Sequence, residues 1–245
     1  MEYKNYIFDL YGTLVDIHTD ESRPEFWQKI ANWYRAYGIG WTGEEIRKAY
    51  LSMVREEEEK LADLNGSAFP EIQLETVFLR LLKEAPDKEA EPGDATPRAD
   101  GKALKKPSGK KMETAWARAT ATFFRITSRD RLCCFAGVPE MLKSLREQGK
   151  RVFLLSNAQS VFTMLELEKC GIENCFNDIF ISSDRGLKKP DPRFLQELMQ
   201  KHAMDPAETV MIGNDPDTDM AVAAVCGVRG ILVSSDGSDI LSLLP

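Results

Sequence analysis

Short apolar runs alternate with amphipathic stretches through the second half of the chain. Apolar residues at helical spacing predict helices over 138–148, 160–170, 192–202 and 217–226. The runs rich in β-branched or aromatic residues lie between these helices, with one more near the N-terminus: 3–10, 151–156, 178–182, 208–212 and 230–233. Short buried strands that alternate with helices favour an α/β fold, in which helices flank a parallel sheet.

Residues 22–84 and 112–128 show a different pattern. Their apolar residues recur at helical spacing, as in Phe26, Ile30 and Trp33, and no strand-like run interrupts them. All four tryptophans of the chain fall in this region, and an aromatic stripe at helical spacing is typical of a core. We therefore expect an α-helical module, inserted between the first strand and the remaining four.

The segment 85–111 is unlike the rest of the chain. Leu104 is its only large apolar residue, and it holds four of the twelve prolines. Its first part is acidic and its second part is basic. Such a segment cannot bury enough apolar surface to offset its ordering entropy. We expect a flexible, solvated insertion within the helical module.

Composition and charge exclude several classes of protein. Among 245 residues there are 32 Lys and Arg against 39 Asp and Glu, a net charge of −7 with a pI near 5.1. This balance argues against a nucleic-acid or anionic-membrane binder driven by bulk charge. The longest apolar runs fall well short of the roughly 18 residues of a membrane span. The N-terminus has no signal-peptide pattern and the five cysteines show no zinc spacing, so we expect a cytoplasmic protein with reduced thiols.

Polar side chains follow the first four predicted strands, where an open parallel sheet places its ligand site. Asp9 to Thr13 follow the first strand, and Ser156 with Asn157 follow the second. Lys188 and Lys189 come after the third strand. The fourth is followed by an acidic cluster: Asn214, Asp215, Asp217 and Asp219. Singly, such residues are most often helix caps, turns or solvated surface. Their order, one set on each strand end, indicates a shared site.

This set of residues suits the transfer of a phosphoryl group. A strand-end Asp can attack phosphorus and form an acyl phosphate. Hydroxyl groups of Thr and Ser can hold the charge of the transferred group, and a lysine can neutralise it. The acidic cluster together with Asp9 can hold Mg²⁺, which prefers oxygen ligands. We expect a small anionic substrate, with neither nucleic acid nor membrane as partner.

The sequence resembles the haloacid dehalogenase superfamily, in the branch with a helical cap inserted after the first strand. The resemblance rests on four motifs in the right order: Phe8-Asp9-Leu10-Tyr11-Gly12-Thr13-Leu14-Val15-Asp16, Leu155-Ser156-Asn157, Gly186-Leu187-Lys188-Lys189-Pro190-Asp191-Pro192 and Ile212-Gly213-Asn214-Asp215. It implies a Rossmann-like core formed by 1–16 and 130–245, and a helical cap formed by 17–129 that contains the insertion 85–111.

The resemblance also implies roles for individual residues. Asp9 would be the nucleophile and Lys189 the lysine of its motif, which leaves Lys188 incidental. Thr13, Ser156 and Asn157 would bind the transferred group. Magnesium would be held by Asp9, the backbone carbonyl of Tyr11, and the acidic cluster at Asn214, Asp215 and Asp219.

Two positions depart from the phosphatases of this superfamily. Those enzymes usually carry a second Asp two residues after the nucleophile as a proton donor and base, and this chain has Tyr11 there. A phenol with an ordinary pKa of about 10 can donate a proton but is a poor base near neutral pH. At the position where those enzymes usually have a magnesium-binding Asp, this chain has Asn214, which offers an oxygen without a charge. His18, just beyond the first motif, is a second hypothesis for the proton transfers.

Three functions follow from these observations. The leading one is a Mg²⁺-dependent phosphatase of a small phosphorylated metabolite, a monomer or homodimer. The second is a metal-independent 2-haloacid dehalogenase, favoured by Tyr11-Gly12-Thr13 but opposed by Leu195, where those enzymes have a tyrosine. The third is a catalytically weak member that binds a ligand or partner.

Overall fold

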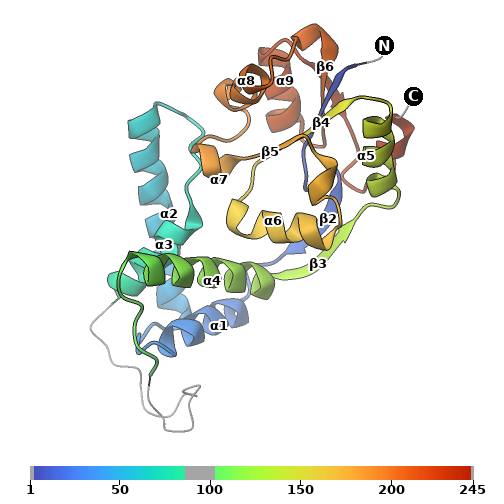
Figure 1. Ribbon diagram of the computed structural model, residues 1–245. Coiled ribbons are helices and arrows are strands. Elements are labelled where there is room, and N and C mark those ends of the chain that lie inside the picture. Colours follow the sequence, from blue (N-terminus) through green and yellow to red (C-terminus); the bar gives the residue numbers. More distant parts are fainter. Residues whose placement is uncertain (1–2, 86–102, 244–245) are drawn as a thin grey trace. The chain divides into compact units, whose positions relative to one another are not determined.

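The computed structural model describes residues 3–85 and 103–243, and the chain falls into two compact units (Figure 1). Unit 1 comprises Met1–His18, Leu61–Glu71 and Arg131–Pro245, and unit 2 comprises Thr19–Lys60 and Ile72–Asp130. Residues 61–71, which the sequence analysis assigns to the helical insert, thus belong to unit 1. The assignment of 17–129 as one cap domain stays a prediction.

Unit 1 is built on a five-stranded sheet. Its strands are β1 (Asn5–Phe8), β4 (Arg151–Ser156), β5 (Asp178–Ile181), β6 (Thr209–Gly213) and β7 (Arg229–Leu232). They lie in the order β5-β4-β1-β6-β7, and all neighbouring pairs are parallel. The predicted α/β fold is therefore confirmed. Phe8 pairs with Leu154 and Ile212, so the ends of the three central strands meet at one edge of the sheet.

Helices cover both faces of this sheet, because successive side chains of each buried strand point to opposite sides. Phe8 packs with α5 (Val138–Glu147) and α6 (Ser160–Lys169). Ile7, one residue earlier, packs with α8 (Pro192–Lys201) and α9 (Ala221–Val225) on the other face. Both clusters consist of apolar side chains that are almost entirely excluded from water, and they form the core that fixes the strand ends.

One predicted helix begins differently from the expectation. Over 217–226 the chain first forms a π-helical turn, Pro216–Met220, and only then α9. The carbonyl of Asp215 accepts from the N–H groups of both Asp219 (3.0 Å) and Met220 (3.2 Å), which widens the turn by one residue.

A second, two-stranded sheet pairs β2 (Val15–Thr19) with β3 (Arg129–Cys134). The sequence does not predict this sheet, because neither strand is a buried apolar run. Three of the six residues of β3 are exposed. The chain passes from unit 1 to unit 2 within β2 and returns within β3.

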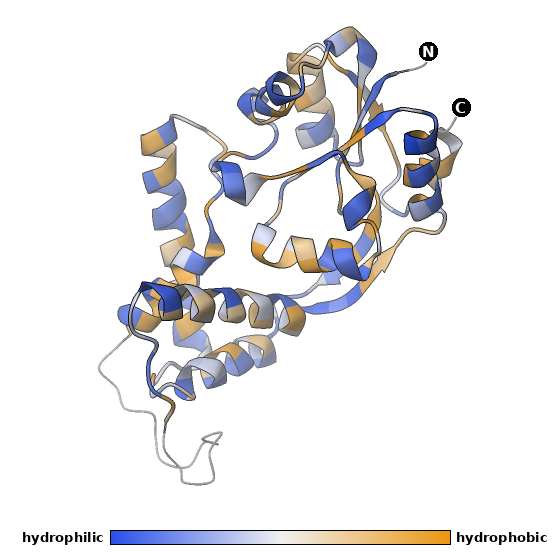
Figure 2. Cartoon of the chain, in the orientation of Figure 1, coloured by the Kyte–Doolittle hydropathy of each residue, from blue (hydrophilic) through white to orange (hydrophobic). Residues whose placement is uncertain are grey.

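Unit 2 is helical in the part that the structure describes, as predicted. It contains α1 (Pro24–Arg35), most of α2 (Gly43–Asn65), α3 (Leu74–Lys83) and α4 (Lys110–Ser128). Its core is aromatic: Phe26, Trp27, Tyr50 and Phe78 surround Phe124 at ring-centroid distances of 4.9 to 5.8 Å. Figure 2 shows hydrophobic and hydrophilic residues alternating along these helices. Of the helices in the described ranges, none is long and apolar enough to cross a membrane.

The insertion 85–111 is only partly within the described residues. Residues 86–102 lie outside them. Lys110 and Lys111, which the sequence places at the end of the insertion, are the first residues of α4, so this helix begins earlier than the expected start at 112. The apolar positions that follow in α4, among them Trp116 and Phe124, are buried in unit 2.

Candidate active site

A pocket of about 180 Å³ lies in unit 1, at the edge where the central strands end. Its lining residues come from the loops that follow β1, β4 and β6 and from the loop that carries Lys189: Asp9, Tyr11, Asn157, Lys189, Asn214, Asp215, Thr218 and Asp219. Residues separated by up to 210 positions in sequence thus form one small polar site, since parallel strands bring their carboxyl ends together.

The ammonium group of Lys189 is the centre of this pocket. It donates to Asp9 Oδ1 and Asp219 Oδ1, each at 2.6 Å, and to the carbonyl of Leu155 at 2.9 Å. The side chains of Lys189 and Asp219 are each 1% exposed and that of Asp9 is 11% exposed. A buried cation with three acceptors is fully satisfied, which offsets much of its desolvation penalty.

Burial and charge act in opposite directions on this cluster. Burial raises the pKa of Asp9 to about 6, although the neighbouring Lys189 lowers it. Burial lowers the pKa of Lys189, but Asp9 and Asp219 outweigh it, and the net shift is upward. At neutral pH, Lys189 is therefore charged and Asp9 is mostly ionised. An ionised Asp9 is the state that a nucleophile requires.

Asn157 fixes the main chain of Lys189. Its Nδ2 donates to the carbonyl of Lys189 at 2.9 Å, and the N–H of Lys189 donates to its Oδ1 at 2.8 Å. Ser156, at the end of β4, is fully buried, and its Oγ has no hydrogen-bond partner. Ser156 itself does not line the pocket, but its neighbour Asn157 does. A buried hydroxyl without a hydrogen-bond partner is costly.

The loop after β1 contacts the loop after β6 through Thr13 and Asn214. The hydroxyl of Thr13, fully buried, donates to Asn214 Oδ1 at 3.0 Å, and Asn214 Nδ2 donates to Ser235 Oγ at 3.1 Å. Gly12 has a φ of +78°, and a Cβ there would lie 2.6 Å from Asn214 Nδ2. Only glycine therefore allows this close approach. Thr13 itself is not among the residues that line the pocket.

Asp215 and Asp219 have different environments. Asp215 Oδ1 caps the π-helical turn by accepting from the N–H groups of Asp217 and Thr218 at 2.8 and 3.2 Å. Asp219 Oδ2 accepts from the N–H of Asp215 at 3.1 Å, while its Oδ1 pairs with Lys189. Its carboxylate lies over Gly213, where an added Cβ would be 2.2 Å away. The widened turn thus places the carboxylate of Asp219 next to the ammonium group of Lys189.

Tyr11 lines the pocket, but its hydroxyl contacts α6. It donates to the carboxylate of Glu166 and shares a hydrogen bond of 3.1 Å with Thr163 Oγ1. Glu166 is 3% exposed and Thr163 is fully buried. The pattern of apolar residues does not reveal them, because α6 buries these two polar side chains while Met164 and Leu165 are exposed.

Two residues near the first motif do not line the pocket. His18 lies in β2 with an exposed side chain, and Asp16 in the same strand forms an ion pair with Arg131 at 3.0 Å. Thr218, which does line it, was missed by the sequence analysis. It has no distinguishing signal beyond its place in the acidic run.

The pocket offers oxygen donors of the kind that Mg²⁺ prefers, on Asp9, Asn214 and Asp215. Across the described residues, no three His, Cys, Asp or Glu side chains form a group that could hold a metal ion. The pocket therefore suits a cation that binds one or two carboxylates and completes its coordination shell with water and substrate phosphate, as Mg²⁺ commonly does.

Comparison with protein families decides the classification. Residues 3–227 match the model of the haloacid dehalogenase-like hydrolases. The chain belongs to this family. The resemblance of the sequence to this family is confirmed. Residues from all four sequence motifs line the pocket.

Curated relatives of this haloacid dehalogenase-like hydrolase carry phosphatase names. A phosphoglycolate phosphatase from Photobacterium profundum is 35% identical over 98 residues, 40% of this chain and 43% of the relative. A glyceraldehyde 3-phosphate phosphatase from Methanothermobacter thermautotrophicus is 28% identical over 102 residues, 42% of this chain and 45% of the relative. The chain thus spans less than half the length of the curated relatives it matches.

Solved structures with the same fold cover nearly the whole chain. A haloacid dehalogenase family enzyme from Bacteroides thetaiotaomicron has a TM-score of 0.59 at 17% identity, with 100% of both chains covered. A 2-haloacid dehalogenase from Pseudomonas syringae has a TM-score of 0.57 at 18% identity, covering 94% of this chain and 86% of the other. At this identity the likeness shows the fold alone.

Proposed function

We propose that the protein is a phosphatase that hydrolyses a small phosphorylated metabolite through an aspartyl-phosphate on Asp9. The observation that carries this proposal is the buried Lys189 ammonium, bonded to Asp9 and Asp219 inside a small polar pocket. A fixed cation beside a carboxylate suits the capture of a dianionic phosphoryl group. The names of the curated relatives support the same reaction class.

The reaction has two steps. A carboxylate oxygen of Asp9 attacks phosphorus, a bond forms between that oxygen and phosphorus, and the bond from phosphorus to the ester oxygen breaks. The departing oxygen takes up a proton and leaves as an alcohol. Water then attacks the aspartyl-phosphate, loses a proton, and releases inorganic phosphate while Asp9 is regenerated.

Three side chains hold the transferred group in this proposal. Lys189 offsets its charge, and the unpaired Oγ of Ser156 donates a hydrogen bond to it. The hydroxyl of Thr13 donates to Asn214 and would turn toward the phosphoryl oxygens. Asn157 acts mainly by fixing the main chain of Lys189.

Mg²⁺ would be held by Asp9, Asn214 and Asp215 with the backbone carbonyl of Tyr11. When bound, it shields the anionic nucleophile from the anionic substrate. Asp219 was a candidate ligand in the sequence, but we propose that it holds Lys189 instead.

The acid role of Tyr11 predicted from the sequence stays a prediction, since its hydroxyl contacts Glu166 and Thr163. Tyr11→Phe removes only the hydroxyl. General acid catalysis is worth roughly 10²- to 10⁴-fold, so a loss in that range supports the role and a loss below tenfold contradicts it. His18→Ala, measured in the same assay, tests the other hypothesis.

A dehalogenase is the second candidate, because Tyr11-Gly12-Thr13 and Ser156-Asn157 suit that reaction as well. Leu195 weighs against it: where those enzymes have a tyrosine, this side chain is fully buried among apolar residues behind the sheet.

One assay separates the candidates. The purified protein is incubated with phosphoglycolate, phosphoserine, glyceraldehyde 3-phosphate and 2-haloacids, with Mg²⁺ or with EDTA. Phosphate release that needs Mg²⁺ and is lost by at least about a thousandfold in Asp9→Asn supports the proposal. Asp236→Asn, an exchange of an exposed carboxylate, is the matched control and should be as active as the natural protein. Halide release that is indifferent to EDTA would overturn the proposal in favour of the dehalogenase.

A further inference from the structure

Residues Asn65–Glu71, the last residue of α2 and the six that follow it, lie against the loop that carries Lys189. The N–H of Lys188 donates to the carbonyl of Phe69 at 3.1 Å. The carbonyl of Gly186 accepts from Asn65 Nδ2 at 2.9 Å and from the N–H of Glu71 at 3.3 Å. This segment, named the brace below, thus forms a short second layer on the lysine loop.

The brace also holds the far end of that loop. Ser67 Oγ donates to Asp191 Oδ2 at 2.5 Å, and the two residues are 4% and 5% exposed. Asp191 begins α8 by accepting from the N–H of Arg193 at 3.0 Å, and Arg193 Nη1 donates to the carbonyl of Asn65 at 2.7 Å. The loop is therefore bonded to the brace on both sides of Lys189.

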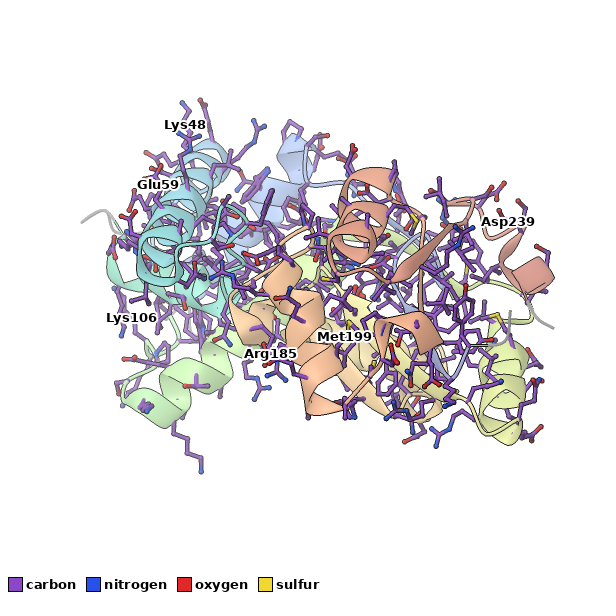
Figure 3. All side chains as sticks on the ribbon, turned by 90° about the horizontal axis from the view of Figure 1, so that it is seen from above. Lys48, Glu59, Lys106, Arg185, Met199 and Asp239 are labelled. Atoms are coloured by element: carbon purple, nitrogen blue, oxygen red, sulfur yellow. The ribbon has the colours of Figure 1, made fainter. Side chains whose placement is uncertain are left out.

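Glu71 connects the brace to a second loop of the site. Its carboxylate accepts from Gln159 Nε2 at 2.8 Å and from Ser182 Oγ at 3.2 Å. Ser182 lies at the start of α7 (Ser182–Arg185), whose last residue is labelled in Figure 3. Its Oγ also accepts from the N–H of Ala158 at 2.8 Å. Asn157, the residue before Ala158, forms the two hydrogen bonds to the main chain of Lys189 described above.

We propose that the brace positions Lys189 for phosphoryl transfer, with Ser67 and Glu71 as positioning residues; this inference rests on the proposed function. The ammonium must reach three acceptors at once, and it sits on a loop rather than on a strand or helix. A displacement near 1 Å at a reacting group can cost about a hundredfold in rate. The brace bonds to both loops that locate this residue, and so it restricts the displacement.

The first test is the kinetics of Ser67→Ala with a phosphate ester that the assay described above shows to be hydrolysed. We expect kcat to fall about tenfold while KM stays within about twofold, at a temperature where the variant is fully folded. Ser67→Thr keeps the hydroxyl and should restore kcat. Glu71→Gln keeps one acceptor oxygen, and its kcat should fall about threefold. Ser22→Ala is the control, because it also removes a hydroxyl that donates to an Asp, at 2.6 Å, but in an exposed, local bond of unit 2.

The second test needs no substrate. Amide hydrogen exchange of Lys188 and Lys189, measured by NMR, should be at least about tenfold faster in Ser67→Ala and unchanged in Ser22→Ala. Unchanged exchange overturns the proposal, as does a loss of kcat that Ser67→Thr fails to restore. If the natural protein hydrolyses no ester, the proposed function fails, while the exchange rates still decide whether the brace holds the lysine loop.

Discussion

In each unit of the molecule a cation pairs with two or three carboxylates, and these two clusters differ in burial. In unit 1, Lys189 pairs with Asp9 and Asp219, with all three side chains at most 11% exposed. In unit 2, Arg80 pairs with Glu56, Glu57 and Glu84, and its partners are 44%, 19% and 50% exposed. More ion pairs surround the arginine, yet water screens them. The effect of breaking an ion pair on the free energy of unfolding therefore depends more on how deeply the pair is buried than on the number of pairs in the cluster.

The largest effect is expected for Lys189→Met, which leaves two buried carboxylates without their cation. Breaking a buried ion pair by removing one partner costs about 3–5 kcal/mol. Urea denaturation at pH 7 measures the free energy of unfolding. Adding Asp219→Asn to Lys189→Met should recover part of the loss, because one of the stranded charges is removed. A loss below about 1 kcal/mol would place this cluster in the same class as that of Arg80.

The next effect concerns pH and Asp9. In the folded chain its pKa is raised to about 6, while the unfolded chain keeps an ordinary value near 3.8. Between these values a folded chain holds more protons on Asp9 than an unfolded one, so the contribution of Asp9 to the free energy of unfolding falls as pH rises from about 4 to 6. The fall should be on the order of 1–3 kcal/mol and should be absent in Asp9→Asn. Denaturation at pH 4, 5, 6 and 7 in EDTA measures the free energy of unfolding of the natural protein and of Asp9→Asn. If the two depend on pH in the same way, the raised pKa of Asp9 is contradicted.

A smaller effect is expected for Asp191→Ala, which removes the cap of α8 and its bonds to Arg193 and Ser67. Loss of such a cap costs about 1 kcal/mol at pH 7. The hydrogen bond from Arg193, aided by Ser67, lowers the pKa of Asp191 to about 2. Its stabilisation is therefore complete above about pH 4 and is lost as pH falls toward 2. Asp205→Ala, at an exposed cap, should cost less.

The smallest effect is expected for Arg80→Met. Exposed ion pairs contribute about 0–1 kcal/mol, and salt screens them. We expect the free energy of unfolding to change by less than about 1 kcal/mol, and the difference from the natural protein to shrink in 1 M NaCl. Turnover should be unchanged. A larger loss that persists in high salt would show that this cluster, too, depends on burial.

Much of the fold could be predicted because its signals are local. The strand that ends at Phe8 and the one that ends at Ser156 are continuous apolar runs, and the residues after them face one pocket. The strands β2 and β3 could not be predicted, since they are held by pairing with each other and carry polar residues.

The candidate site divides in the same way. The sequence places Asp9, Asn157 and Lys189 near one another, because each follows a strand of a parallel sheet. It does not show that Asp219 turns toward Lys189, since that depends on a turn one residue wider than an α-helix. Nor does it show Ser67 beside Asp191, a contact between residues 124 positions apart with no shared pattern.

The chain passes between the two units four times, after residues 18, 60, 71 and 130. A recombination event with two breakpoints, one in β2 and one in β3, would exchange the helices together with the brace. A shortened chain that joined His18 directly to Arg131 would likewise lose Asn65, Ser67 and Glu71 from beside the lysine loop. The helical insert and the brace are thus inherited as one piece, and transplanting the insert alone requires four junctions rather than two.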